Sequence, residues 1–159
     1  MDFIWSPWRY DYLASGGAKP LSCVFCVGED RTHDAERLIV FRGIHNFIIL
    51  NLFPYTSGHL MVAPYEHLDT IVSAKADQLM EMMQLAQKSI GVLQKLYRAE
   101  GFNVGMNIGS AAGAGIREHF HLHVVPRWFG DANFVSIIGE TRVLPEDLHK
   151  TYERMKAEL

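Results

Sequence analysis

Three histidines within five residues, His119, His121 and His123, carry the strongest chemical signal in the sequence. They alternate with apolar residues in the segment HFHLHVV, and alternation on a β-strand turns every second side chain to the same face. Residues two apart on one face lie about 7 Å from each other, so we expect one short row of imidazoles. Imidazole can act as a nucleophile, an acid or a metal ligand near neutral pH. The alternative is a plain solvent-exposed strand face, which normally carries Thr, Lys or Glu instead.

The two cysteines, Cys23 and Cys26, stand at CxxC spacing. Two cysteines this close cannot form the disulfide framework of a small secreted protein. In a protein that stays inside the cell, the spacing is compatible with half of a metal site, a redox pair or buried core residues. The cysteine pattern by itself leaves these three interpretations open.

Composition limits the class of protein. A chain of 159 residues with 48% hydrophobic and 21% charged residues can bury one core, so we expect a single domain over residues 1–159. The formal net charge of −3 disfavours a nucleic-acid partner. Apolar stretches are shorter than the roughly 18 residues of a membrane span, and the opening MDFIWSPWRYDYL does not resemble a signal peptide. These features predict a soluble, cytoplasmic protein without a membrane partner.

The elements expected to position these residues are strands, one long helix and a terminal helix. Residues 1–30 read as an irregular aromatic arm, and residues 129–159 as a C-terminal extension. Apolar runs bounded by turn residues predict strands at 38–41, 46–52, 60–63, 102–108, 119–125 and 134–138. Pro145 fits the first turn of a helix over 146–159. This order predicts an α+β domain whose early strands form an antiparallel meander.

The long helix is indicated by apolar residues at three- and four-residue steps from 79 to 97. On this pattern, Met82 and Met83 are both expected in the core. Gly101 follows the helix at a place where a C-terminal cap is common.

The triad segment resembles a known family. HFHLHVV fits the signature H-φ-H-φ-H-φ-φ, with φ apolar, of the histidine triad (HIT) family of nucleotide hydrolases and transferases. Residues 51–64 (NLFPYTSGHLMVAP), the CVFC segment and the Gly-rich loop before the triad are similar to that family as well, so the resemblance covers residues 23–127. It implies a HIT-like antiparallel sheet of about five strands with one long helix and a C-terminal helix.

One branch of the family is especially similar. WSPWRYDYL, AGAGIREH, Trp128 and NFVSIIGETRVLP resemble the bacterial diadenosine tetraphosphate phosphorylases. The resemblance implies cleavage of dinucleoside polyphosphates at the α-phosphate through a nucleotidyl-histidine, with phosphate as acceptor and ATP and ADP as products. The alternatives are a hydrolase that uses water, a nucleoside phosphoramidase, and a zinc-stabilised nucleotide-binding module without turnover.

The resemblance also implies catalytic and ribose-binding roles. His121 would be the nucleophile, and His123 and His59 would donate hydrogen bonds to the α-phosphate. Asn51 would hydrogen-bond the ribose hydroxyls, and Asn107 would face the polyphosphate.

Further contacts to the substrate are expected from loops and apolar strands. Small residues in loop 109–115, including Ser110 and Gly115, could offer backbone amides to phosphate, although many relatives have a Gln-Thr pair where this chain has Gly115 and Ile116. Trp128 could stack on a base or line the mouth of the site. Residues considered for an adenine pocket are Phe41, Ile49 and Leu50.

A structural zinc ion is implied by the zinc-containing relatives. Their ligands match Cys23, Cys26, His67 and His119, which would form a closed tetrahedral site. Mg²⁺ could accompany the substrate and shield its phosphate charge. By analogy with the family, we expect a homodimer in which two sheets join edge to edge.

Overall fold

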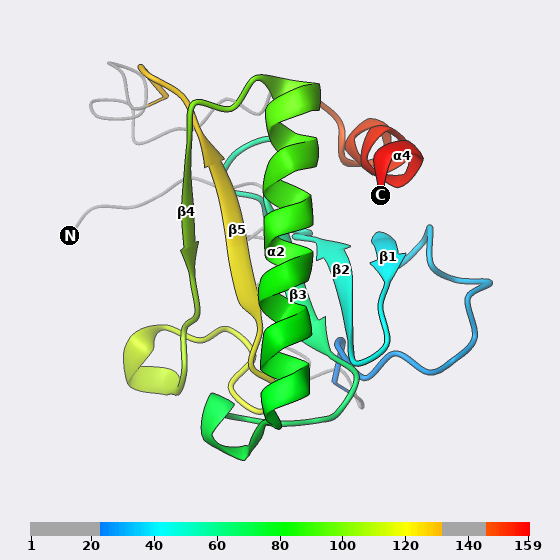
Figure 1. Cartoon of the computed structure of the whole chain (residues 1–159), viewed down its shortest axis with the longest axis vertical. Coiled ribbons are helices and arrows are strands. Elements are labelled where there is room, and N and C mark those ends of the chain that lie inside the picture. The colour runs from blue at the N-terminus through cyan, green and yellow to red at the C-terminus, as the bar shows by residue number, and fades with distance from the viewer. Residues whose placement is uncertain (1–22, 132–145) are drawn as a thin grey trace, which may run out of the picture.

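The computed structural model describes residues 23–131 and 146–159, and it confirms the predicted α+β fold. Five strands form one antiparallel sheet in the order β1-β2-β3-β5-β4 (Figure 1). The predicted strand 134–138 and most of the predicted arm 1–30 lie outside the described residues. The strands are β1 (Ile39–Arg42), β2 (Asn46–Leu50), β3 (Leu60–Pro64), β4 (Gly101–Gly105) and β5 (Leu122–Arg127).

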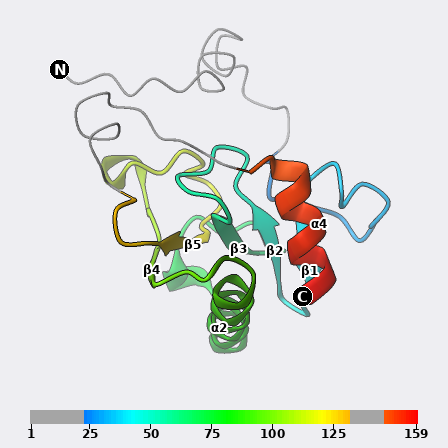
Figure 2. The same ribbon diagram turned by 90° about the horizontal axis from the view of Figure 1, so that it is seen from above.

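The long helix α2 (Ala76–Tyr97) covers one face of the sheet. Figure 2 shows α2 on one side of the sheet and the loops that follow β2 and β4 on the other side. In β2, Ile48 and Leu50 belong to the core beneath α2, whereas Phe47 and Ile49 belong to a second apolar cluster on the opposite face. This alternation follows from the two-residue period of a strand, and it separates a packing face from a face that is available for chemistry.

Helix α2 has a capping interaction at its start and a left-handed residue at its end. The Lys75 N–H donates to Oε1 of Gln78 (2.8 Å), as in one half of a capping box. The helix ends at Arg98, whose left-handed φ of 51° places the cap three residues before Gly101, the predicted position.

Within the described ranges, no helix combines the length and apolarity required to cross a membrane.

The two neighbouring methionines of α2 have different environments. Met82 is buried in the core as predicted, whereas Met83 is 55% exposed, so that part of the prediction is wrong. Successive helical residues point about 100° apart, and this rotation carries Met83 outside the buried arc that holds Met82, Leu85, Ala86 and Leu93.

The C-terminal residues form α4 (Leu148–Glu158), which confirms the predicted terminal helix. The Asp147 side chain accepts a hydrogen bond from the His149 N–H (2.8 Å) and caps its first turn. Helix α4 packs against α2 and β1. Lys95 and Glu158 form an ion pair across the two helices (2.6 Å). Helix α4 therefore covers the β1 side of the sheet.

Two short 3₁₀-helices, η1 (Ile71–Ser73) and η2 (Ser110–Ala112), lie in the connections before α2 and after β4. The connection between β2 and β3 contains Gly58, directly before His59. Gly58 has a φ of +81°, and a Cβ atom there would lie 2.7 Å from Cδ2 of Leu93 in α2. The backbone therefore approaches α2 at a position that only glycine fits.

Gly58→Ala should destabilise the protein by about 1–3 kcal/mol, because alanine would adopt a strained φ and collide with Leu93. Gly91→Ala is the matched control. Gly91 lies exposed within α2, and a Cβ there meets nothing within 4 Å. Removing a helical glycine should raise stability by about 0.5–1 kcal/mol. Urea unfolding of both variants measures these effects, and an equally stable Gly58→Ala would contradict the close approach.

Candidate active site and metal centre

The triad histidines share one side of the sheet, although the strand begins later than predicted. Strand β5 starts at Leu122, so His119 and His121 lie in the segment that precedes it. The ring centroids of His121 and His123 lie 4.8 Å apart. His123 stands opposite Met61 in the pairing of β3 with β5, and both face away from α2. The predicted row of imidazoles is therefore present.

His121 is held in one tautomer by the backbone. Its Nδ1 lies 3.0 Å from the carbonyl oxygen of His119, and only a protonated nitrogen can donate to a carbonyl. The proton therefore resides on Nδ1, and Nε2 carries the lone pair. Burial lowers the pKa of His121, and the hydrogen bond to His119 opposes this only in part. The result is a neutral imidazole with a free nucleophilic nitrogen.

His59 and His123 form a hydrogen-bonded pair in which the tautomer of each ring is defined. The backbone N–H of Tyr55 donates to Nδ1 of His59 (3.1 Å), so His59 carries its proton on Nε2. That Nε2 lies 3.0 Å from Nδ1 of His123 and donates to it, which leaves the His123 proton on Nε2. His59 is only 1% exposed. We predicted that His59 would donate to the α-phosphate directly; instead, its N–H is directed at His123.

Asn51 lies beside His59 at the base of the loop between β2 and β3. Its backbone N–H donates to the carbonyl of His59 (3.0 Å), and its Oδ1 accepts from the N–H of Phe53 (2.9 Å). Its Nδ2 lies 3.3 Å from Nδ1 of His59. The structure thus places Asn51 beside His59, and its predicted contact to the ribose hydroxyls stays a prediction.

The Gly-rich loop returns to the histidine face. Gly109 and Gly113 both have a φ of 80°, and Ile116 packs against the apolar cluster on the histidine side of the sheet. Ser110 and Gly115 are exposed in this loop, and Asn107 is half-buried before it. The contacts predicted for these three residues involve a substrate, so they stay predictions.

Two of the three adenine-pocket candidates lie on the face of the sheet opposite the histidines. Phe41 and Leu50 pack into the core beneath α2, so only Ile49 among the three adenine-pocket candidates is on the histidine face. Trp128 follows β5, and its indole N–H donates to the carbonyl of Tyr97 at the end of α2 (3.1 Å). Alternation places Leu50 on the face beneath α2, and the β-bulge between Ile39 and Phe41 turns Phe41 to that same face. The predicted stacking of Trp128 on a base involves a substrate, so it stays a prediction.

The four predicted metal ligands converge on one point. Their ligand atoms all lie within 4.8 Å of one another. Nε2 of His119 donates to the carbonyl of Pro64 (2.8 Å), which leaves the lone pair of Nδ1 facing the sulfur atoms of Cys23 (3.5 Å) and Cys26 (3.9 Å). Nδ1 of His67 lies 3.2 Å from the sulfur of Cys26. Burial and the neighbouring Cys23 raise the pKa of the Cys26 thiol, and a bound cation would supply the charge that favours thiolates. The group can therefore hold a metal ion.

Comparisons with known proteins agree with this arrangement. The HIT domain model matches residues 32–130. An AP-4-A phosphorylase of Mycobacterium tuberculosis is 40% identical over 161 residues, covering 98% of this chain and 83% of the relative. The chain belongs to the HIT family. The predicted membership is confirmed, and so is the similarity to this kind of phosphorylase.

Solved HIT structures share the fold. A zinc-bound histidine triad family protein from Mycobacterium smegmatis has a TM-score of 0.68 and 26% identity, covering 87% of this chain and 93% of that one. A diadenosine triphosphate hydrolase of Plasmodium falciparum has a TM-score of 0.63 at 15% identity, covering 77% of this chain and 76% of that one. At that identity, the second similarity concerns the fold alone.

Two aromatic residues of the HIT site were missed at the sequence level. Phe25 packs against the rings of His119 and His121, and Tyr55 lies 4.6 Å from the ring of His59. Phe25 stands between the two cysteines, and Tyr55 lies in the block that resembles the family. Their positions in these motifs were the available signal.

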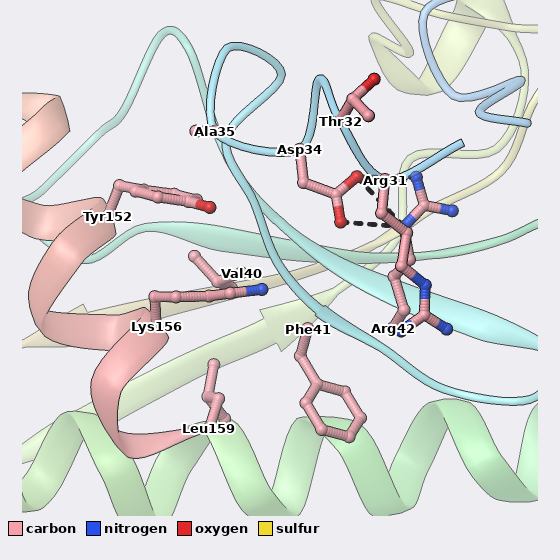
Figure 3. A pocket seen from close by; sticks show the side chains of 10 residues that line it. All are labelled: Arg31, Thr32, Asp34, Ala35, Val40, Phe41, Arg42, Tyr152, Lys156 and Leu159. Atoms are coloured by element: carbon pink, nitrogen blue, oxygen red, sulfur yellow. Dashed lines mark hydrogen bonds and ion pairs between the residues drawn. The ribbon is translucent and has the colours of Figure 1, made fainter. Parts of the chain in front are cut away.

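A cavity of about 410 Å³ lies apart from the HIT site, between β1, the preceding turn and α4 (Figure 3). Its polar wall is dominated by the ion pair between Arg42 and Asp34 (2.7 Å). Arg42 also donates to the carbonyls of Gly28 and Asp30, so its guanidinium is engaged by the protein. None of the residues that line the cavity is a histidine or cysteine.

The acid stability of this HIT domain should depend on His123. Burial and the adjacent His121 lower the pKa of His123 to about 4, whereas an unfolded histidine titrates near 6.5. The unfolded chain therefore binds more protons between these values, and stability should fall as the pH drops from about 6.5 to about 4. NMR titration of the His123 ring nitrogens measures the pKa, and protonation near pH 6.5 would contradict it. In urea unfolding, His123→Gln should lose less stability over this range.

Proposed function

We propose that this HIT protein is a nucleotidyltransferase that cleaves dinucleoside polyphosphates at the α-phosphate, and that diadenosine tetraphosphate and phosphate are converted to ATP and ADP. The observation that carries the proposal is the hydrogen bond from Nδ1 of His121 to the His119 carbonyl, which leaves Nε2 able to attack phosphorus. The name of the M. tuberculosis relative supports the choice of substrate and acceptor.

The reaction has two balanced steps. Nε2 of His121 forms a bond to the α-phosphorus while the bond to the bridging oxygen breaks, and ATP leaves with the electron pair of that bond. An oxygen of inorganic phosphate then attacks the adenylylated histidine, releasing ADP and restoring the imidazole. Because His121 is neutral before attack, it approaches the anionic substrate with its lone pair available.

The neighbouring histidines support these steps in different ways. Nε2–H of His123 is the donor that remains for a phosphate oxygen, since its Nδ1 accepts from His59. His59 is a positioning residue that fixes the tautomer and ring plane of His123. Asn51 would bind the ribose hydroxyls, and backbone amides of loop 109–115, with Ser110, would bind the acceptor phosphate. Gly115 and Asn107 would border the polyphosphate, whose charge Mg²⁺ would help to shield.

Incubation with diadenosine tetraphosphate, with and without inorganic phosphate, tests the activity. Chromatography should find ATP and ADP, formed only when phosphate is present. Products of AMP and ATP that are unaffected by phosphate would identify a hydrolase, and no product under any condition would identify a binding module.

The matched variant is His121→Ala. It should retain nucleotide binding but lose activity by more than a hundredfold, because the nucleophile is removed while other residues form the pocket. A variant that keeps more than about one per cent of wild-type activity, a loss of under roughly 3 kcal/mol in transition-state stabilisation, would contradict the assignment.

We propose zinc as the metal held by Cys23, Cys26, His67 and His119. Zn–S bonds of about 2.3 Å and Zn–N bonds of about 2.0 Å place sulfur and nitrogen about 3.5 Å apart in a tetrahedron. Three of the four sulfur–nitrogen distances here span 3.2 to 3.9 Å, and all four ligand atoms lie within 4.8 Å of one another. Four protein ligands of this kind form a closed site, which fits a structural role. The zinc-bound M. smegmatis structure supports the same identity.

Metal analysis of protein purified without chelator or affinity tag should find about one zinc ion per chain. His119→Ala should lower metal content and the melting temperature first and activity second, whereas His121→Ala should lower activity and keep the metal. A disulfide between Cys23 and Cys26, or a metal-free protein with full activity and stability, would overturn the site.

We also propose that two chains pair through β4. This strand is the last in the sheet, and Val104 in its centre is 43% exposed. An exposed edge strand offers backbone groups for pairing with a second copy. The family resemblance supports this arrangement.

A further inference from the structure

Phe25 connects the metal centre with the catalytic histidines. It stands between the two cysteines of the CVFC turn and is only 2% exposed. Its ring lies 5.4 Å from the His119 ring and 4.6 Å from the His121 ring. We propose that Phe25 is a positioning residue. When the metal-binding turn is ordered, the Phe25 ring is held in place and in turn fixes the orientation of the His121 imidazole. Its effect on turnover rests on the function proposed above.

The geometry of the turn determines where the Phe25 ring lies. The Cys26 N–H donates to the Cys23 carbonyl (3.1 Å), and the Val27 N–H donates to the Phe25 carbonyl (2.9 Å). With the turn closed in this way, both sulfur atoms face Nδ1 of His119 while the ring of Phe25 is buried beside the triad. Ligation of both cysteines would therefore fix the direction of the Phe25 side chain as well.

His121 needs this second contact because one hydrogen bond cannot define its orientation. The bond from Nδ1 to the His119 carbonyl sets the tautomer but does not by itself fix the plane of the imidazole, which also meets the His123 ring edge-on at 4.8 Å. An aromatic ring packed against the imidazole, with an interplanar angle of 39°, limits rotation of that plane. Nε2 must point along the line of attack, and a displacement of about 1 Å can reduce the rate about a hundredfold.

The contact of Phe25 with the His119 ring adds a second constraint on the position of Nε2 of His121. His119 offers its ring to the metal centre and its backbone carbonyl to His121. Packing of Phe25 on both rings therefore fixes the acceptor carbonyl of His119 and the imidazole of His121 relative to each other. Loss of the ring should loosen the nucleophile without removing a metal ligand.

Phe25→Ala and Phe25→Leu test the proposal, with Val27→Ala as the control. Val27 is buried in the same segment and the same apolar cluster, so its truncation reports a loss of packing alone. Phe25→Ala should lower kcat about 10- to 100-fold, change KM less than twofold and keep the metal content of the wild type. Phe25→Leu, which retains apolar volume, should recover part of kcat. Val27→Ala should lower the melting temperature while kcat stays within twofold.

NMR of the Nδ1–H proton of His121 gives a readout that is independent of turnover. Its signal should be broadened or shifted in Phe25→Ala and unchanged in Val27→Ala. If the wild type turns over no dinucleotide, the proposed function fails, and these spectra still decide the role of Phe25. If Phe25→Ala does not fold, the same measurements on Phe25→Leu decide it. Unchanged kcat and an unchanged His121 signal in the folded variant would overturn the proposal.

Removal of the metal tests whether Phe25 couples the metal-binding turn to His121. Dialysis of wild-type protein against a chelator should broaden the His121 signal, because the turn that holds Phe25 loses its ligated cysteines. In Phe25→Ala, the same treatment should cause little further change. An equal response to metal removal in both proteins would show that Phe25 does not carry the coupling.

Discussion

The hydrogen bond from Nδ1 of His121 to the carbonyl of His119 links the two halves of this site. It leaves Nε2 of His121 available for chemistry, and through Nδ1 it joins the same ring to His119, one of the four residues that can hold a metal ion. The side chain of His119 is itself fixed, because its Nε2 donates to the Pro64 carbonyl at the end of β3. The direction of Nε2 of His121 therefore depends on the pairing of β3 with the triad segment. It also depends on the cysteine sulfur atoms that Nδ1 of His119 faces.

The sheet supplies this geometry by assigning different tasks to its two faces. Leu122 and Val124 of β5 pack beneath α2, while His123 between them points to the opposite face. Gly58 brings the adjacent backbone close to α2 and thereby sets the position of His59. Close packing on one face thus holds the reactive groups on the other in a fixed register.

The sequence predicted the parts that depend on local patterns. Alternation and turn residues located the described strands, and helical periodicity located α2. The resemblance to zinc-containing relatives, and not the CxxC spacing alone, identified the four residues that can hold a metal ion. Details that depend on tertiary packing were not predictable. Met83 has the composition of a core residue but lies outside the buried arc of α2, and Arg98 ends the helix in a conformation that more often selects glycine.

The same limit applied within the site. The direction of the His59 N–H depends on the fold of the loop that brings the Tyr55 backbone to its other nitrogen. The indole N–H of Trp128 gives a second example, because it donates to the Tyr97 carbonyl at the end of α2, a contact that no sequence pattern indicates. Proximity in sequence is a weak guide here, because successive residues of an extended segment face opposite sides of the sheet.

Burial of the imidazoles has a consequence for how an anionic substrate would be bound. Burial lowers the pKa of His119, His121 and His123, and neighbouring imidazoles lower the pKa of His119 and His123 further, so the row is neutral near pH 7. Neutral rings offer a lone pair and N–H donors, but they do not balance the charge of a polyphosphate. That charge must be met by other groups, and we infer that these are backbone amides of the Gly-rich loop and a cation brought with the substrate. A protonated imidazole would attract the phosphate but could not attack it, because its lone pair is taken. With neutral histidines, nucleophilic attack and the neutralisation of phosphate charge are performed by different groups.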